Sequence, residues 1–97
     1  MWWTRKLPRT LDEAADHVLK LLSPEEREKF VSYAEQDLIL LHHSLGMYIR
    51  NEFGLWDGRN KALLSQFEYR HPDDISSIII RTAWKKLRAR MDTKHNT

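Results

Sequence analysis

Histidine and carboxylate side chains are the groups in this chain that could hold a metal ion or move protons. His42 and His43 are adjacent, and neighbours on a helix point about 100° apart, so one ion could take only one of them. A metal site, as in a metal-assisted hydrolase, would add His71 and Asp73 from a later connection. The alternative places His42 at the edge of the core, bonded to a backbone carbonyl or to a carboxylate of the 71–74 turn. The sequence favours this alternative and predicts no cofactor.

A second polar group surrounds Trp56. Arg50 and Asn51 precede it, and Arg59 follows it in a turn that contains glycine. Glycine lets a backbone approach a ligand closely, so these residues could form a small pocket for an anion or a peptide. The alternative is structural, with the Arg50 guanidinium bonding Asp57 or the free carbonyls at a helix C-terminus.

Two adjacent indoles stand near the start of the sequence. If Trp2 and Trp3 are exposed, they present about 300–500 Å² of mostly apolar surface. The largest apolar patch of a typical monomer covers about 300–600 Å², and such a patch is often functional. Either this segment folds back over the domain or it contacts a partner, and the sequence leaves both open.

Charge is distributed unevenly along the chain, although the total is only +2. Residues 10–37 hold eight acids and three bases, whereas residues 71–97 hold six bases and three acids. On the last expected helix Arg81, Lys85 and Arg88 share one face and could contact the phosphates of a nucleic acid. Alternatively this face is solvated, or it docks on the acidic part of the chain.

Start signals place two helices in the first third of the chain. Thr10 and Glu13 have the spacing of a capping box, and Ser23 followed by Pro24 begins a second helix that ends near Tyr33. The first helix is expected to bury one apolar face, made of Leu11, Ala14, Ala15, Val18, Leu21 and Leu22. The second is expected to turn four side chains inward, namely Arg27, Phe30, Val31 and Ala34.

Three further helices follow. Asp37 is expected to cap a long third helix, which Gly54 ends in the left-handed conformation. Its apolar residues recur at helical spacing: Leu38, Leu41, Leu45, Ile49 and Phe53. Asn60 could cap a short fourth helix with Leu63, Leu64 and Phe67. Pro72 and two acids open the last helix, whose apolar face is Ile75, Ile79, Ile80, Ala83, Trp84, Leu87 and Met91.

The sequence therefore predicts an all-α fold, a compact bundle of about five helices with the third and last at its centre. No segment alternates between apolar and polar residues for long enough to predict a strand. Ninety-seven residues allow one domain, 1–97, in which 1–9 is an N-terminal extension and 92–97 a frayed tail.

Composition excludes several classes of protein. The chain has no cysteine, so disulfide scaffolds, thiolate metal sites and a cysteine nucleophile are ruled out. The longest apolar run is Leu38–Leu41, whereas a membrane helix needs about 20 residues. The first residues lack the apolar core of a signal peptide. We therefore expect a cytoplasmic protein without a membrane partner.

The segment from Leu41 to Trp56, which reads LHHSLGMYIRNEFGLW, resembles a family of small bacterial proteins known as a domain of unknown function. The segments 7–14, 71–74 (HPDD) and 78–84 are similar to the same family. The resemblance implies a whole domain from a bacterial or phage setting. It implies no activity.

These observations favour a non-enzymatic protein-interaction module, such as an immunity-type partner, a phage-encoded inhibitor or a homodimer. No organised catalytic set is evident, whereas large aromatic residues are numerous for so short a chain. The candidate contact residues are Trp2, Trp3, Arg50, Asn51, Trp56 and Arg59. Nucleic-acid binding through the basic helix is the alternative, and a metal-assisted hydrolase is a third hypothesis.

Overall fold

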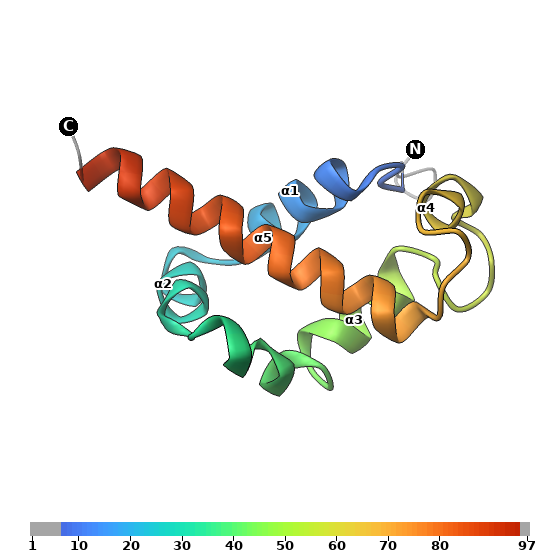
Figure 1. Ribbon diagram of the computed structural model, residues 1–97, viewed down its shortest axis with the longest axis horizontal. Coiled ribbons are helices and arrows are strands. Elements are labelled where there is room, and N and C mark those ends of the chain that lie inside the picture. Colours follow the sequence, from blue (N-terminus) through green and yellow to red (C-terminus); the bar gives the residue numbers. More distant parts are fainter. Residues whose placement is uncertain (1–6, 96–97) are drawn as a thin grey trace.

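One long helix, α5 (Pro72–His95), runs through the molecule from one end to the other (Figure 1). The computed structural model describes the backbone of residues 7–95 and the side chains of residues 7–91. Buried side chains recur along α5 as the sequence predicted: Ile75, Ile79, Ile80, Ala83, Trp84 and Leu87. The helix continues to His95, into the segment 92–97 that was expected to be frayed.

The first helix, α1 (Leu11–Leu21), begins as predicted with Thr10 as its cap, since Thr10 Oγ1 accepts the N–H of Glu13 at 3.1 Å. In a complete capping box the Glu13 carboxylate would accept the N–H of Thr10. Here it accepts the N–H of Arg9 instead, at 2.8 Å. The buried side chains of α1 are Ala14, Ala15, Val18 and Leu19. Leu21 is exposed, so the prediction that it lies in the core was wrong. Leu19 is buried instead, because it follows Ala15 by four residues and so lies on the same face of the helix.

The second helix, α2 (Pro24–Ser32), carries a complete capping box. Ser23 Oγ accepts the N–H of Glu26 at 3.2 Å, and the Glu26 carboxylate accepts the N–H of Ser23 at 2.8 Å. Phe30 is buried as predicted. Ala34 is exposed, contrary to prediction, because the chain turns to an extended conformation at Tyr33 and leaves the helical path.

Two short elements replace the long third helix that was predicted. The first is a 3₁₀ helix, η2 (Glu35–Leu41), and the second is α3 (Leu45–Glu52). Between them the His42 carbonyl accepts from Arg50 Nη2 at 3.3 Å. The prediction of one continuous helix capped by Asp37 was wrong, because a buried arginine eight residues away takes a carbonyl at the break.

The connection from α3 to α4 (Lys61–Gln66) is fixed by one buried side chain, Asn60. As predicted, Asn60 caps α4, since its Oδ1 accepts the N–H of Leu63 at 3.1 Å. Its amide also donates to the carbonyls of Pro8 at 2.7 Å and Phe53 at 2.9 Å. Gly54 has a φ of +71°, the left-handed value predicted for the residue that ends the helix before it.

α5 is the centre of the bundle, and α1 is its principal neighbour. α3 packs against α5 less extensively than α1 does, so the prediction that the third and last helices form the centre holds only for the last. The indole N–H of Trp84 on α5 donates to the Tyr33 carbonyl at 3.1 Å and joins α5 to the end of α2.

The predicted all-α fold is confirmed. Residues 7–95 contain five α-helices, one 3₁₀ helix and no strand. No helix within this described range is both long enough and apolar enough to cross a membrane.

Candidate functional site

A buried arginine organises one end of the molecule. Arg50 is only 4% exposed, although arginine is almost never fully buried unless it is paired. Its Nη1 donates to Ser76 Oγ at 3.0 Å, and its Nε lies 3.4 Å from Asp73 Oδ1. Gly46 leaves room for this arrangement, because a Cβ at that position would lie 2.9 Å from Arg50 Nη1. Arg50 therefore joins η2, α3 and the start of α5 from inside.

Two histidines flank the same carboxylate. His42 Nε2 lies 4.0 Å from Asp73 Oδ1, and His71 Nδ1 lies 3.7 Å from Asp73 Oδ2. His71 Nδ1 also accepts the backbone N–H of Asp73 at 3.0 Å, which caps α5. The sequence predicted that His42 bonds a backbone carbonyl or a carboxylate of the 71–74 turn. His42 does lie near Asp73, but 4.0 Å is too long for a hydrogen bond, and its Nδ1 is buried without a hydrogen-bond partner.

The metal hypothesis finds no support in this cluster. No group of three or more histidine, cysteine, aspartate or glutamate side chains in the described part of the chain could hold a metal ion. The position beside Asp73 is already taken by the cationic Arg50, which would repel a metal ion. His43 contributes a ring contact to His42, at 5.3 Å between centroids.

Trp56 lies over this cluster at the protein surface. Its side chain is 53% exposed, and the Arg50 guanidinium carbon lies 5.8 Å from the indole centroid. The His71 ring meets the indole edge-on, with centroids 5.8 Å apart and planes at 89°. These two contacts hold one face of the indole in place while the rest stays accessible.

Arg59 closes the loop that carries Trp56. Its Nη2 donates to the Asn51 carbonyl at 3.0 Å, and its Nε lies 3.0 Å from Asp57 Oδ2. Hydrogen bonding from the Arg59 backbone N–H, with the nearby guanidinium charge, lowers the pKa of the Asp57 carboxyl. The sequence assigned the bonding of helix-end carbonyls and Asp57 to Arg50, whereas the structure gives this role to Arg59.

The candidate contact residues are thus only partly brought together. Trp56 and Arg59 are exposed around one loop, and Asn51 joins that loop through its carbonyl. Arg50 lies beneath the surface as a support for Trp56. Trp2 and Trp3 lie outside the described residues.

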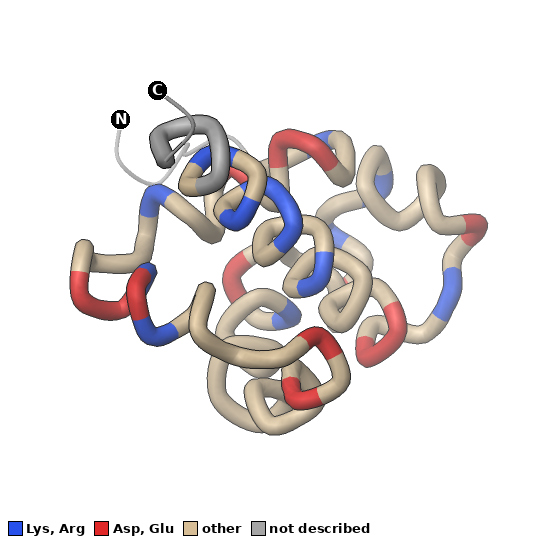
Figure 2. Tube along the Cα trace, turned by 60° about the vertical axis from the view of Figure 1, so that its left-hand side comes forward, with Lys and Arg blue, Asp and Glu red and all other residues tan. Residues whose placement is uncertain are grey.

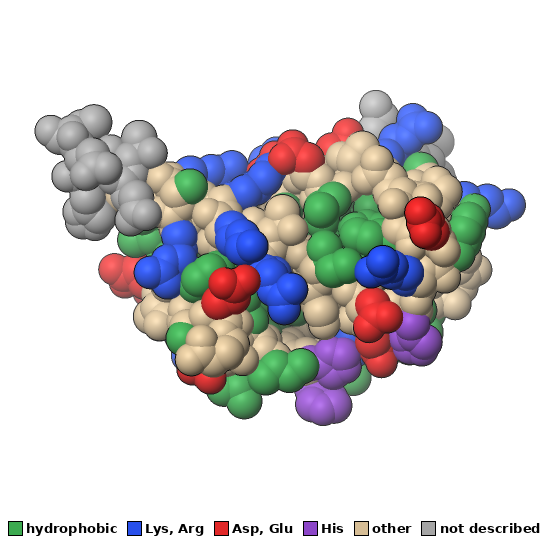
Figure 3. All heavy atoms as spheres, in the orientation of Figure 1, with side chains coloured by type: hydrophobic (Ala, Val, Ile, Leu, Met, Phe, Trp, Pro, Cys, Tyr) green, Lys and Arg blue, Asp and Glu red, His purple; other side chains and the backbone are tan. Residues whose placement is uncertain are grey.

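Two of the three cations on the basic face of α5 lie near a carboxylate of another element, and the third lies over a tryptophan ring of α5 itself. Arg81 Nε and Lys85 Nζ lie 3.5 Å and 3.7 Å from the Glu35 carboxylate at the start of η2. Arg88 has its guanidinium carbon 4.7 Å from the Trp84 ring centroid, on the same helix. In Figure 3 basic and acidic side chains lie side by side over this face. The cations that were expected to bind phosphates therefore already have partners within the chain, which weakens the phosphate-binding hypothesis.

α1 neutralises the flank of the same helix. Lys86 forms ion pairs with Asp12 and Asp16, and Arg90 Nη2 lies 3.2 Å from Asp16 Oδ1. The hydrogen bond from Lys86 lowers the pKa of Asp16, and the bond to Asp12 raises the pKa of Lys86. Figure 2 shows basic positions of α5 close to acidic positions of neighbouring segments. Of the two alternatives for the uneven charge, the geometry favours mutual attraction within the chain.

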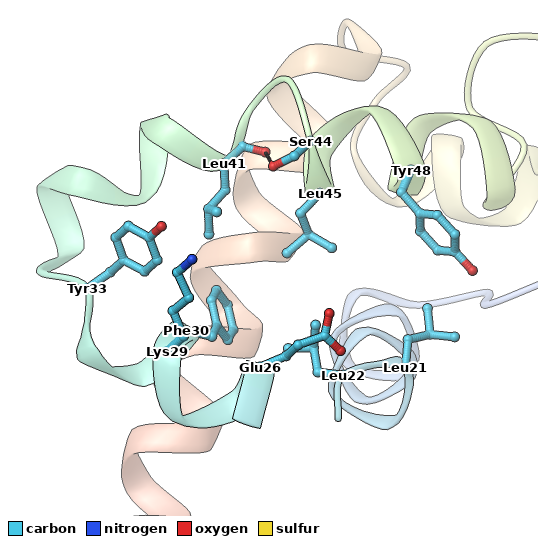
Figure 4. A pocket seen from close by; sticks show the side chains of 10 residues that line it. All are labelled: Leu21, Leu22, Glu26, Lys29, Phe30, Tyr33, Leu41, Ser44, Leu45 and Tyr48. Carbon is cyan, nitrogen blue, oxygen red and sulfur yellow. Dashed lines mark hydrogen bonds between the residues drawn. The ribbon is translucent and has the colours of Figure 1, made fainter. Parts of the chain in front are cut away.

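Sequence reasoning missed an open cavity of about 490 Å³ between α1, α2, η2 and α3 (Figure 4). α5 crosses behind it in this view. Most of its lining is apolar or aromatic, and the set comprises Leu21, Leu22, Glu26, Lys29, Phe30, Tyr33, Leu41, Ser44, Leu45 and Tyr48. The cavity itself depends on how four elements pack, which no local pattern records.

Comparison with known proteins gives a family and nothing more specific. A family model described as Domain of unknown function (DUF6794) matches residues 7–87. No curated protein and no solved structure matches the chain.

Proposed function

Because the chain belongs to the family described as Domain of unknown function (DUF6794), whose description carries no activity, we propose a function from the chain's own surface. In this proposal the chain is a non-enzymatic protein-interaction module, and Trp56 is the centre of its contact surface. The observation that carries this proposal is an exposed indole held in place by a buried cation and a histidine ring.

Tryptophan, tyrosine and arginine are enriched among the residues that dominate binding energy, and the rim of a protein interface is polar. Trp56 has that setting, since the side chains of Asp57, Arg59 and His71 around it are more than half exposed. The indole also loses little freedom on binding, because Arg50 and His71 already contact it. Preorganisation of this kind lowers the entropic cost of association.

Nucleic-acid binding is less well supported by the same surface chemistry. Affinity for a nucleic acid comes largely from lysine and arginine side chains that neutralise its phosphates and so release the counterions condensed on it. On α5, Arg81 and Lys85 face Glu35, and Lys86 and Arg90 face the acids of α1. These carboxylates would compete with phosphate for the same cations.

The setting we propose is the bacterial cytoplasm, where an immunity-type or inhibitor-type partner is the expected class of target. This part of the proposal rests on the resemblance to small bacterial proteins and on the sequence expectations above. Fractionation of native cells with an antibody against the chain tests it, and recovery in a membrane or secreted fraction contradicts it.

Affinity capture from native cells tests the contact surface. Three baits are compared, namely the wild-type chain, Trp56→Ala and Met47→Ala, which removes another half-exposed apolar side chain. We expect one set of proteins to bind the first and third baits and to be lost from Trp56→Ala. In a titration with the purified partner, Trp56→Ala should raise Kd at least about tenfold. Equal capture by all three baits would exclude Trp56 as the contact centre.

A further inference from the structure

His71 connects the start of α5 to the loop that carries Trp56. Its Nδ1 accepts the backbone N–H of Asp73 at 3.0 Å, and its ring meets the Trp56 indole edge-on with centroids 5.8 Å apart. A ring nitrogen accepts a hydrogen bond only while it carries a lone pair, so the proton of this imidazole is on Nε2 and the ring is neutral. The observed contact with Trp56 is therefore that of the uncharged histidine.

A proton on Nδ1 of His71 converts this acceptor into a donor. The new N–H would point at the backbone N–H of Asp73, which is also a donor. The nearby acceptor is the Asp73 carboxylate, whose Oδ2 lies 3.7 Å from Nδ1 and so is too distant for a hydrogen bond in the observed position. The charged ring must turn to reach this oxygen, and the turn changes its contact with Trp56.

The charges around His71 leave that oxygen accessible to it. His42 Nε2 and Arg50 Nε lie 4.0 Å and 3.4 Å from Asp73 Oδ1, on the other side of the carboxylate. Among the described side chains, His71 forms an ion pair with Asp73 alone. The other charges on the adjoining loop and chain positions are of both signs, namely Asp57, Arg59, Arg70 and Asp74.

We propose that His71 is a pH-sensitive switch of the Trp56 surface. Neutral His71 holds the indole, and protonated His71 turns away from it to pair with the Asp73 carboxylate. This inference rests on the function proposed for Trp56, because it names how that surface is regulated. Histidine changes its charge between pH 5 and 8, and protonation of histidines alters interfaces in other pH sensors. A partner should therefore bind more tightly at neutral pH than in mild acid.

Nuclear magnetic resonance of the isotope-labelled chain tests the switch without a partner. Long-range proton–nitrogen spectra distinguish a ring nitrogen with a lone pair from one with a proton, so His71 Nδ1 should be unprotonated at pH 7.5. As the pH falls to 5.5, the signals of the Asp73 backbone amide and the Trp56 indole N–H should shift with the same midpoint as the His71 ring. The indole signal is assigned by its absence from Trp56→Phe.

Two histidine substitutions separate this movement from general effects of acid. His71→Asn keeps an acceptor for the Asp73 N–H, because asparagine is a favoured N-cap, but its side chain does not titrate. The pH-dependent shift of the Trp56 indole should vanish in this variant. His43→Asn is the matched control and should leave the shift unchanged, since His43 is exposed and contacts the ring of His42. An indole signal that does not follow the His71 ring, or that shifts equally in His71→Asn, overturns the proposal.

Affinity capture at the two pH values tests the effect on binding. The wild-type bait should capture about three- to tenfold less partner at pH 5.5 than at pH 7.5, because an ordinary histidine is about nine-tenths protonated at pH 5.5. His71→Asn lacks the edge-on ring, so it should capture less than wild type at pH 7.5 and the same amount at both pH values. Titration of the partner itself affects both baits alike, so equal losses from both overturn the switch. No capture by wild type at pH 7.5 contradicts the function proposed for Trp56, and the spectra alone then decide whether His71 releases the indole.

Discussion

At the scale of single residues, Arg50 shows how a charge can be buried in so small a domain. Its guanidinium donates to Ser76 and to the His42 carbonyl and lies beside Asp73, so the desolvation penalty is offset by two partners from α5 and one from the segment between η2 and α3. The indole of Trp56 lies over it. The same residue therefore stabilises the fold and positions the side chain that we propose to bind a partner.

Replacing Arg50 with methionine is expected to destabilise the protein by about 3 kcal/mol, because the buried Ser76 hydroxyl and the His42 carbonyl lose their donor. Urea denaturation followed by circular dichroism measures the change. Arg59→Met is the matched control, since Arg59 pairs with Asp57 on the surface and its loss should leave the midpoint close to wild type. Equal effects of the two substitutions would contradict the internal role of Arg50.

Asp16 predicts a specific dependence of stability on pH. Its pKa is lowered from the ordinary 3.8, chiefly by the hydrogen bond from Lys86, so the folded state binds the proton less tightly than the unfolded state. The stabilisation is therefore present above pH 3.8 and is lost as pH falls through the lowered pKa. Asp16→Asn should lower the urea midpoint at pH 7 and lose less stability than wild type on acidification to pH 2. Parallel losses in both proteins would contradict this assignment.

The position of His42 could be predicted at this scale, and the role of Arg50 could not. Helical periodicity places His42 near the apolar stripe, so a neighbouring carboxylate was a reasonable expectation. The partners of Arg50 include Ser76, 26 residues further along the chain, and only the packing of α3 on α5 brings them together.

At the scale of elements, local sequence signals were sufficient to predict a helix where residues of that helix and its cap stabilise it. Thr10, Ser23 and Asn60 all cap the helices that the sequence assigned to them. α5 was also predicted, because its apolar spacing extends over several turns. The region 35–53 has a similar apolar spacing, yet it divides into η2 and α3. Arg50, which is held against Ser76 of α5, bonds the His42 carbonyl at the break.

The hydrogen bonds of Asn60 join three segments of the chain, since they reach Pro8, Phe53 at the end of α3, and Leu63 in α4. Asn60→Asp keeps the oxygen that caps α4, but it removes the two N–H groups that donate to Pro8 and Phe53. The substitution should destabilise the protein by about 2 kcal/mol or more, because buried acceptors lose their donors and a charge is buried. Asn51→Asp, on the surface of α3, is the control for the same chemical change. Denaturant midpoints of the two variants that agree would show that Asn60 does not join these elements.

At the scale of the whole molecule, the net charge of +2 conceals an internal balance. Acids of α1 and η2 lie against bases of α5, so the uneven charge of the sequence is largely used within the fold. The described surface also presents an exposed tryptophan at one site and an open, mostly apolar cavity at another. Trp56 was named from the sequence as a candidate contact residue. Its contacts with Arg50 and His71, and the cavity, could not be predicted, because each depends on several elements packing together.

We assign no catalytic chemistry to the cluster of His42, His71 and Asp73, because the cationic guanidinium of Arg50 already lies beside the Asp73 carboxylate.

Site-specific photo-crosslinking in native cells tests the central claim most directly. A photoreactive benzoylphenylalanine is introduced at position 57 in one strain and at position 69 in another, since Asp57 is exposed beside an intact Trp56 and Tyr69 is exposed in the connection before α5. We predict that illumination yields a discrete adduct between position 57 and a protein other than the chain itself, and that position 69 yields none. No adduct at position 57, or the same adduct from both positions, would contradict the proposal.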